Sequence, residues 1–242
     1  MKISILLPYK ENFTIQYPGA VSLFVYDTTK HSVFKKTIKI FGNTNYKSFL
    51  SKNYTNIKIS KKVLQSTGKF YVNNFIELQK KSPPDLIEVH NRPSYIKQIH
   101  DKLKYKINLY FHNDPLNMNG SKTYEERIEL LDNVNHIIFN SNWSRNRFFI
   151  GIDKNKYSHK MSTIYQSASK VKINFKKKQK IISFVGKLNK AKGYDIFCDA
   201  ITTILDKYPD WSAAVFGDEP REEINVYHKR LKVFGFKKHS HI

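Results

Sequence analysis

Short apolar runs alternate with longer helical runs along most of the 242-residue chain. The runs with a strand pattern are Ile3 to Leu7, Val33 to Ile40, Leu86 to Val89, Ile107 to Phe111, His136 to Phe139, Met161 to Ile164, Ile181 to Val185 and Ala213 to Phe216. The runs with a helical pattern are Val21 to Asp27, Tyr46 to Ser51, Gly68 to Lys81, Pro93 to Leu103, Tyr124 to Leu131, Asn142 to Phe149, Tyr194 to Tyr208 and Glu222 to Phe234. Because strands that alternate with helices form βαβ units, this order predicts an α/β fold around a parallel sheet.

The composition changes between Ser167 and Lys180, where serine and lysine replace most apolar residues. We interpret residues 171–180 as a linker between two domains. The first domain, residues 1–170, has enough predicted strands for a doubly wound sheet. The second, residues 181–242, has only two predicted strands and two predicted helices, which is short for an independent domain. We therefore expect it to be incomplete, either because the sequence is a fragment or because the protein is truncated.

The chain is strongly basic, with 42 Lys and Arg against 20 Asp and Glu and a formal net charge of +22. Such a charge favours anionic partners, and nucleic acid, an anionic membrane surface and phosphate-bearing substrates are the three candidates. The lysines are scattered and accompany abundant Asn, Ile, Tyr and Phe, a mixture that A·T-rich coding also produces. No zinc-finger spacing, RNP-type strand or basic heptad accompanies them, so nucleic-acid binding is the weakest of the three.

The sequence predicts a cytoplasmic protein that contacts a membrane at most peripherally. Its one cysteine, Cys198, cannot form an internal disulfide. The apolar run that follows Met1 is too short for a signal peptide. No run approaches the roughly 20 apolar residues of a membrane span.

Residues 181–195 combine an apolar strand, a glycine turn and an amphipathic helix in the sequence IISFVGKLNKAKGYD. A glycine lets the backbone approach an anion, and the start of a helix directs N–H groups and a positive dipole end toward it. Lys187 and Lys192 add positive charge. The segment therefore predicts a phosphate site, and the alternative is an ordinary βα turn with solvated lysines.

Polar residues also follow earlier predicted strands. His112 follows the fourth, at the carboxyl edge where open α/β sheets bind ligands. Gly19 precedes the helix after the first strand, and His90 and Arg92 follow the third. The alternatives are a turn histidine, a rigid Pro-Gly turn and a helix-capping turn with a surface arginine.

The order of these motifs resembles that of GT-B glycosyltransferases of the family 4 type. In that family the pattern F-V-G-[RK]-L…K-G opens the second domain, and residues 184–193 here read F-V-G-K-L-N-K-A-K-G. Residues 215–220 are similar to the family's next strand and its glycine turn. The resemblance implies a GT-B architecture, with an N-terminal Rossmann-like doubly wound parallel sheet, an incomplete second Rossmann-like domain and a nucleotide-sugar cleft between them.

The resemblance also implies roles for individual residues. The expected donor-binding residues are Gly186, Lys187, Lys192 and Gly217. The expected acceptor-side residues are Gly19, His90 and Arg92. The expected catalytic residues are His112, Lys187 and Lys192, of which the histidine would contact the donor sugar or the acceptor. The two lysines would stabilise charge on the leaving diphosphate.

The function implied by the resemblance is transfer of a sugar from a nucleotide-sugar to a saccharide or lipid-linked acceptor in cell-surface glycan synthesis. Such enzymes usually retain the anomeric configuration and use neither a cofactor nor a metal. The chain departs from the family at Pro18, where a first glycine is common, and at residues 164–167, which read I-Y-Q-S in place of I-P-N-G. The family's acidic E-x7-E region has no counterpart. A non-catalytic nucleotide- or sugar-binding remnant and a basic nucleic-acid-binding protein are the alternatives.

Overall fold

The structure is a computed structural model that describes residues 1–59, 66–167, 178–219 and 223–237. The chain divides into two compact units, residues 1–168 and residues 169–242. The predicted linker, residues 171–180, lies mostly outside the described residues. Within the described ranges, no helix combines the length and the apolar character that a membrane crossing requires.

Unit 1 is built around a sheet of seven parallel strands. In spatial order they are β3 (Tyr54–Asn56), β2 (Ile38–Gly42), β1 (Ile3–Leu6), β4 (Leu86–His90), β5 (Lys106–Phe111), β6 (His136–Phe139) and β7 (Met161–Thr163). The chain runs outward from β1 to β3 and then returns to the other side of β1. The predicted doubly wound parallel sheet is thus confirmed, and its topological switch point lies between β1 and β4.

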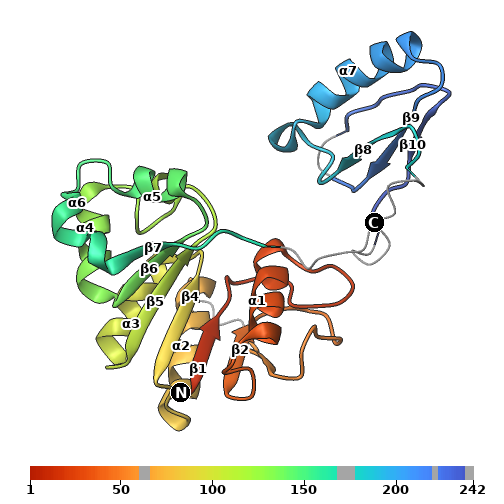
Figure 1. Cartoon of the computed structure of the whole chain (residues 1–242). Helices are drawn as coiled ribbons and strands as arrows, with labels where there is room; N and C mark the ends of the chain where they lie inside the picture. The colour runs from red at the N-terminus through yellow and green to blue at the C-terminus, as the bar shows by residue number, and fades with distance from the viewer. Residues whose placement is uncertain (60–65, 168–177, 220–222, 238–242) are drawn as a thin grey trace. The chain divides into compact units, whose positions relative to one another are not determined.

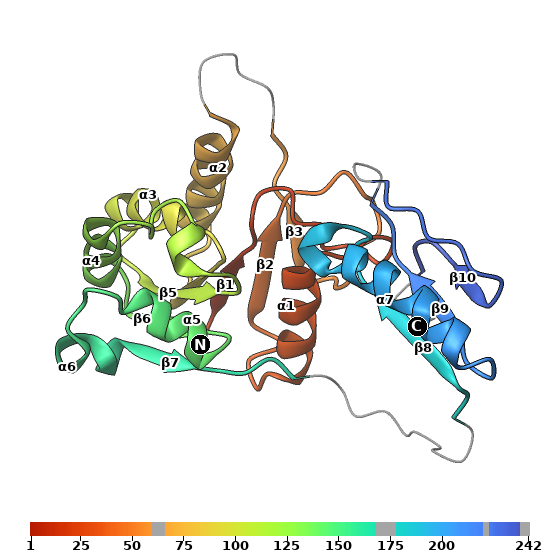
Figure 2. The same cartoon turned by 90° about the horizontal axis from the view of Figure 1, so that it is seen from above.

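Helices cover the two faces of this sheet unequally. They are α1 (Ala20–His31), α2 (Thr67–Lys81), α3 (Ile96–Lys102), α4 (Tyr124–Asn133), α5 (Asn142–Phe148) and α6 (Lys154–Tyr157). The crossover from β1 to β2 runs across the sheet in one direction, and the crossovers from β3 toward β7 run in the other. Because crossovers of this kind are right-handed, the two sets lie on opposite faces of the sheet. Figure 2 shows α1 on one side of the sheet and α2, α3 and α4 on the other.

The alternation of side chains along β4 and β5 follows from this layering. Ile87 and Val89 of β4 point into the larger apolar core, together with Leu109 of β5. The residues between them, including Glu88, point to the face that carries α1. That face is more polar, and Phe24 of α1 packs on it.

Unit 2 consists of β8 (Ile181–Val185), the 3-10 turn η5 (Lys190–Lys192), α7 (Tyr194–Lys207), β9 (Ser212–Phe216) and β10 (Leu231–Val233). The three strands are parallel and lie in the order β10, β9, β8 (Figure 1). The buried side of α7, which includes Tyr194, Ile201 and Leu205, packs on one face of this sheet. The arrangement is Rossmann-like, as predicted.

Two predicted helices are absent. Residues 46–51 form bends, and Phe49 pairs with Thr14 in an isolated antiparallel bridge. Residues 223–230 have no helix, and Leu231–Val233 forms strand β10 beside β9. In both places tertiary pairing outweighs a weak helical pattern, because each segment supplies apolar side chains to a neighbouring core.

One strand prediction also needs correction, and two strands were missed. The strand predicted from Val33 begins only at Ile38, because residues 34–37 form a turn. β3 and β10, each of three residues, were not predicted. Strands this short carry too few residues for a clear alternation of apolar and polar side chains.

Candidate functional site

Two predicted site residues meet at the carboxyl ends of β4 and β5. His90 is the last residue of β4, and His112 follows the last residue of β5. The ring nitrogens His90 Nδ1 and His112 Nε2 lie 3.0 Å apart. Because parallel register places His90 opposite Tyr110, their rings stack with centroids 4.4 Å apart. The two histidines therefore form one hydrogen-bonded pair.

The backbone around His112 is held from both neighbouring strands. Its N–H donates to the side-chain oxygen of Asn91 at 3.2 Å, and its carbonyl accepts from the side-chain amide of Asn140 at 2.9 Å. Asn91 has a φ of 54°, a left-handed conformation that non-glycine residues rarely adopt and that clusters at functional sites. Phe24 of α1 packs edge-on against the imidazole, with centroids 4.9 Å apart. These contacts fix where His112 can act.

The electrostatic environment keeps His112 neutral. Burial, together with the neighbouring His90, lowers the pKa of His112 to about 3. At pH 7 its imidazole therefore offers one N–H donor and one lone pair. This chemistry suits hydrogen bonding to a polar ligand and does not suit attraction of an anion.

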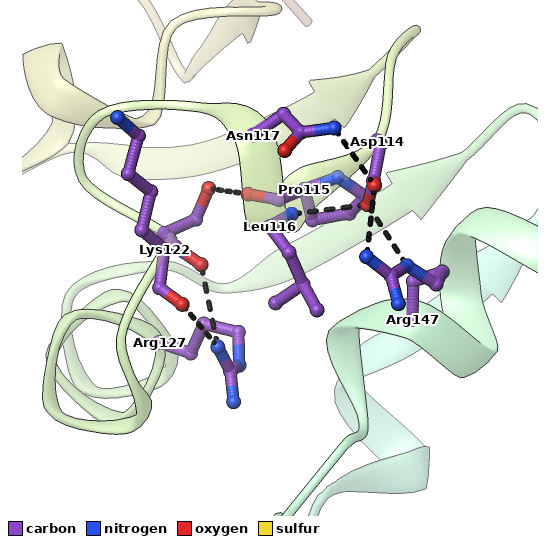
Figure 3. Close-up of polar contacts among 8 residues, drawn as sticks. Asp114, Pro115, Leu116, Asn117, Lys122, Arg127 and Arg147 are labelled. Atoms are coloured by element: carbon purple, nitrogen blue, oxygen red, sulfur yellow. Dashed lines mark hydrogen bonds and ion pairs between the residues drawn. The ribbon is translucent and has the colours of Figure 1, made fainter.

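The loop after His112 is braced by Asp114 (Figure 3). The Asp114 carboxylate accepts hydrogen bonds from the backbone N–H of Leu116 and from the side-chain amide of Asn117, each at 3.1 Å. It also pairs with Arg147 of α5, whose Nη2 lies 3.1 Å from Oδ2. The short turn η2 (Pro115–Asn117) is thereby tied to α5.

The far end of the same loop is held by Arg127 of α4 (Figure 3). This side chain is buried and donates from Nη1 to the carbonyl of Lys122 at 2.9 Å and to that of Ser121 at 3.5 Å. Its Nη2 donates to the carbonyl of Ile150 at 2.7 Å. The guanidinium therefore links two segments of backbone through three carbonyls, and one of these segments is the loop that begins at His112.

The predicted acceptor-side residue Gly19 lies beside a carboxylate of the same chain. Gly19 is the N-cap of α1 and offers no side chain to cap the helix. Instead, Glu11 Oε1 accepts a hydrogen bond from the backbone N–H of Ser22 at 3.0 Å. A Cβ atom on Gly19 would lie 1.9 Å from that oxygen. The start of α1 is thus occupied by the chain's own anion, and glycine is required to admit it.

Substitutions at Gly19 and Glu11 are therefore expected to be strongly non-additive. Gly19→Ala would push the Glu11 carboxylate away from the start of α1. It should therefore remove the same capping hydrogen bond as Glu11→Ala and lower the free energy of unfolding by about 1 kcal/mol. The double variant should cost about as much as either single variant. Urea unfolding of the four proteins measures this, and additive losses would contradict the proposed contact.

The predicted residue Arg92 interacts with the backbone of its own turn. Its Nη1 donates to the carbonyl of Asn91 at 2.7 Å, so it braces the left-handed residue that holds His112. Glu88 and Gln166 were missed. Glu88 Oε2 lies 3.8 Å from His90 Nε2, and Gln166 Nε2 lies 3.1 Å from His112 Nδ1. Period-two spacing could have identified Glu88, but nothing in the sequence indicates Gln166.

A cavity of about 290 Å³ lies between α1 and the polar face of the sheet. Its lining includes Phe24 and Thr28 of α1 and Glu88, His90 and Tyr110 of the strands. Most of the remaining lining is apolar, and of the two histidines only His90 borders this cavity. Across the four described ranges, no group of three or more His, Cys, Asp or Glu side chains is placed to hold a metal ion.

In unit 2, the loops after β8 and β9 touch through their backbones. Gly217 has a φ of 144°, and a Cβ atom there would lie 1.7 Å from the carbonyl oxygen of Gly186. Gly186 itself has room, because its nearest neighbour to a built Cβ would be Phe184 at 3.7 Å. Gly217 is therefore required by the fold, whereas nothing in the packing of the described residues requires glycine at position 186.

The predicted turn from glycine into helix is longer than the sequence suggests. Asn189 caps the turn η5 by accepting from the N–H of Lys192 at 3.2 Å, and its Nδ2 donates to Glu219 at 3.2 Å. Only then does α7 begin, after Gly193 with a φ of 72°. Lys187 and Lys192 both lie exposed in this segment, and neither ammonium has a carboxylate partner among the described residues. Both are placed to attract an anion.

The fold matches those of solved proteins at low sequence identity. Sucrose-phosphate synthase from Thermosynechococcus elongatus gives a TM-score of 0.70 at 13% identity, covering 100% of this chain and 72% of that one. HepE of Anabaena, solved in complex with UDP-glucose, gives 0.67 at 13% identity, with 98% and 70% covered. A UDP-N-acetylglucosamine 2-epimerase gives 0.53 at 10% identity, with 88% and 63% covered.

No protein-family model matches the sequence, and no curated protein matches it. At such low identity the structural likenesses show the fold alone. The α/β architecture of this chain is the Rossmann-like one found in GT-B glycosyltransferases.

Proposed function

We propose that this chain binds a nucleotide-sugar and transfers its sugar to a saccharide or lipid-linked acceptor. The observation that carries the proposal is the loop after β8. Gly186 is a glycine that the packing of the described residues does not need, and the exposed Lys187 and Lys192 lie close to it in sequence. The Gly186 N–H donates to the Phe216 carbonyl at 3.0 Å, so the loop offers a diphosphate space at this glycine and the positive charge of two lysines that have no carboxylate partner among the described residues.

The chemistry of transfer would use these groups in the transition state. As the glycosidic bond breaks, negative charge develops on the leaving diphosphate. Lys187 and Lys192 would stabilise that charge more than they stabilise the ground state, which lowers the barrier without a metal ion. We further propose a family 4 type of enzyme that retains the anomeric configuration.

The carboxyl ends of β4 and β5 in unit 1 would bind the sugar, which is uncharged. His112 would contact a sugar hydroxyl, and His90 and Arg92 would support it from β4 and its turn. A lipid-linked acceptor for cell-surface glycan synthesis would agree with the net charge of +22, because anionic membranes attract basic proteins.

A second candidate is a protein that binds the nucleotide-sugar without transferring the sugar. The loop after β8 would be sufficient for such binding, because its positive charge can hold a diphosphate without any catalytic group. The two candidates share the loop after β8 and differ in turnover.

Replacing Lys187 with alanine tests the role of this loop. We expect the rate of sugar transfer from a panel of UDP-sugars to fall on the order of a hundredfold, because one charge-assisted contact to the leaving group is lost. Release of UDP in the presence of acceptor measures turnover. Lys207→Ala, at the other end of α7, removes the same charge and should leave the rate unchanged.

The outcomes separate the candidates. Turnover by the Lys187→Ala protein as fast as that of the wild type would exclude the assigned role. UDP-sugar binding that depends on Lys187 but is accompanied by no transfer would favour the second candidate.

A further inference from the structure

Four side chains from three segments form a continuous row near the carboxyl ends of the strands of unit 1. Glu88 Oε2 lies 3.8 Å from His90 Nε2, and His90 Nδ1 lies 3.0 Å from His112 Nε2. His112 Nδ1 in turn lies 3.1 Å from Gln166 Nε2. Glu88 and His90 are two residues apart on one strand and share a face, while His112 continues from the adjacent strand.

The carboxylate at one end decides which nitrogen of each imidazole carries the proton. A carboxylate only accepts hydrogen bonds, so it attracts an N–H at His90 Nε2 and repels a lone pair there. His90 is almost fully buried, and its Nε2 forms no hydrogen bond with any described residue, so the carboxylate 3.8 Å away acts on it electrostatically. A single proton on the His90 ring therefore belongs on Nε2, which leaves Nδ1 as an acceptor.

The position of the proton on His90 also determines which nitrogen of His112 carries a proton. Since His90 Nδ1 accepts, the nitrogen 3.0 Å away, His112 Nε2, must be the donor. Neutral His112 then has its lone pair on Nδ1. The amide of Gln166, which is exposed, donates to that lone pair, so each donor in the row faces an acceptor.

We propose that Glu88 and His90 are positioning residues that lock His112 in the Nε2–H tautomer, so that its Nδ1 binds a hydroxyl group of the sugar. The identity of the ligand rests on the proposed function, whereas the tautomer lock does not. In this assignment a sugar hydroxyl donates to Nδ1 where the Gln166 amide donates in the structure. Because the imidazole is neutral and offers a lone pair, phosphate oxygens are excluded from this position.

Nitrogen-15 labelling of the histidines in the full chain tests the lock without any substrate. Long-range proton–nitrogen correlation spectra distinguish a protonated ring nitrogen from a bare one. We expect His90 and His112 both to carry the proton on Nε2, with His90→Gln and His112→Gln proteins used to assign the signals. A proton on Nδ1 of His112 in the wild type would overturn the proposal, and this result needs no variant of Glu88 to fold.

Glu88→Gln tests the origin of the lock. An amide presents either an oxygen or an N–H to His90, so the preference for Nε2–H should be lost and His112 should show mixed tautomers. Glu129→Gln, an equal charge change in an exposed ion pair on α4, should change neither spectrum. Unchanged tautomers in the Glu88→Gln protein would overturn the role given to the carboxylate.

The ligand is tested with UDP-glucose and UDP as probes. UDP-glucose, but not UDP, should shift the Nδ1 signal of His112, and Glu88→Gln should weaken UDP-glucose binding roughly tenfold while UDP binding stays the same. UDP-glucose that binds without moving the Nδ1 signal would overturn the ligand assignment. If neither probe binds, the proposed function and the ligand assignment fail together, while the tautomer lock is judged by the labelled histidines.

Discussion

Replacing Gly217 with alanine is expected to lower the free energy of unfolding of unit 2 by about 3 kcal/mol or more. Two effects add. The φ of 144° lies in a region that alanine rarely adopts, and the new Cβ would overlap the carbonyl oxygen of Gly186. That oxygen belongs to backbone, which cannot rotate away as a side chain would. The strand ends of β8 and β9 would have to separate.

The matched control is Gly186→Ala, in the neighbouring loop. A Cβ there meets nothing closer than 3.7 Å, so the stability of unit 2 should change by less than about 1 kcal/mol. The same control should impair nucleotide-sugar binding if the proposed function is right. Similar stability losses for the two alanine variants would contradict the distinction between a structural and a ligand-facing glycine.

The two tryptophans make the measurement selective, because Trp143 lies in unit 1 and Trp211 in unit 2. Trp211 packs against the core under α7, so its fluorescence should change when unit 2 unfolds. A Trp143→Phe background therefore reports unit 2 alone during urea titration. This matters because a chain of two units need not unfold in a single transition.

Replacing Arg127 with methionine is expected to lower the free energy of unfolding of unit 1 by about 3 kcal/mol. The change preserves the apolar stem but leaves three carbonyl acceptors, those of Ser121, Lys122 and Ile150, without their charged donor. Buried acceptors that lose a partner each cost about 1 kcal/mol or more. Hydrogen exchange followed by mass spectrometry should show early opening of residues 115–122.

Arg127→Lys separates geometry from charge. A lysine keeps the positive charge, but a single ammonium cannot replace the planar fork that donates from Nη1 and from Nη2 to separate carbonyls. We expect it to restore only part of the stability. A methionine variant as stable as the wild type, with unchanged exchange in residues 115–122, would show that the loop does not depend on Arg127.

The parallel sheet was predictable because its central strands are apolar and alternate with helices of ordinary length. Strands at Ile3, Leu86, Ile107 and His136 were all recognised from short apolar runs, and parallel sheets that are covered on their faces give such runs. The carboxyl ends of these strands were then natural places to seek polar residues. His90 and His112 were both found in this way.

The pairing of those histidines was not predictable from the sequence. It depends on the register of β4 with β5, which places His90 opposite Tyr110 and brings His112 within 3.0 Å. A shift of one residue would turn the two rings to opposite faces of the sheet. The roles of Glu11 and Gln166 likewise arise from loops whose path no local pattern specifies.

The failed helix over residues 222–234 shows the limit of periodicity. Its apolar residues are compatible with helical spacing, but Leu231 and Val233 pair with β9, whose edge would otherwise remain open. Ile224 and Val226 pack against the core under α7 from a segment without helix. Sequence reasoning evaluates a segment alone, and here its neighbours decide the outcome.

The strand order of unit 1 also affects how the chain folds. β1 is made before the other strands, yet it lies inside the sheet and pairs on one side with β4, where Ile3 meets Leu86. Closing so long a stretch of chain is slow compared with forming local helices or hairpins. During synthesis the apolar first strand must therefore remain without its full set of neighbours until β4 has left the ribosome, and chaperone binding in this interval would protect it from aggregation.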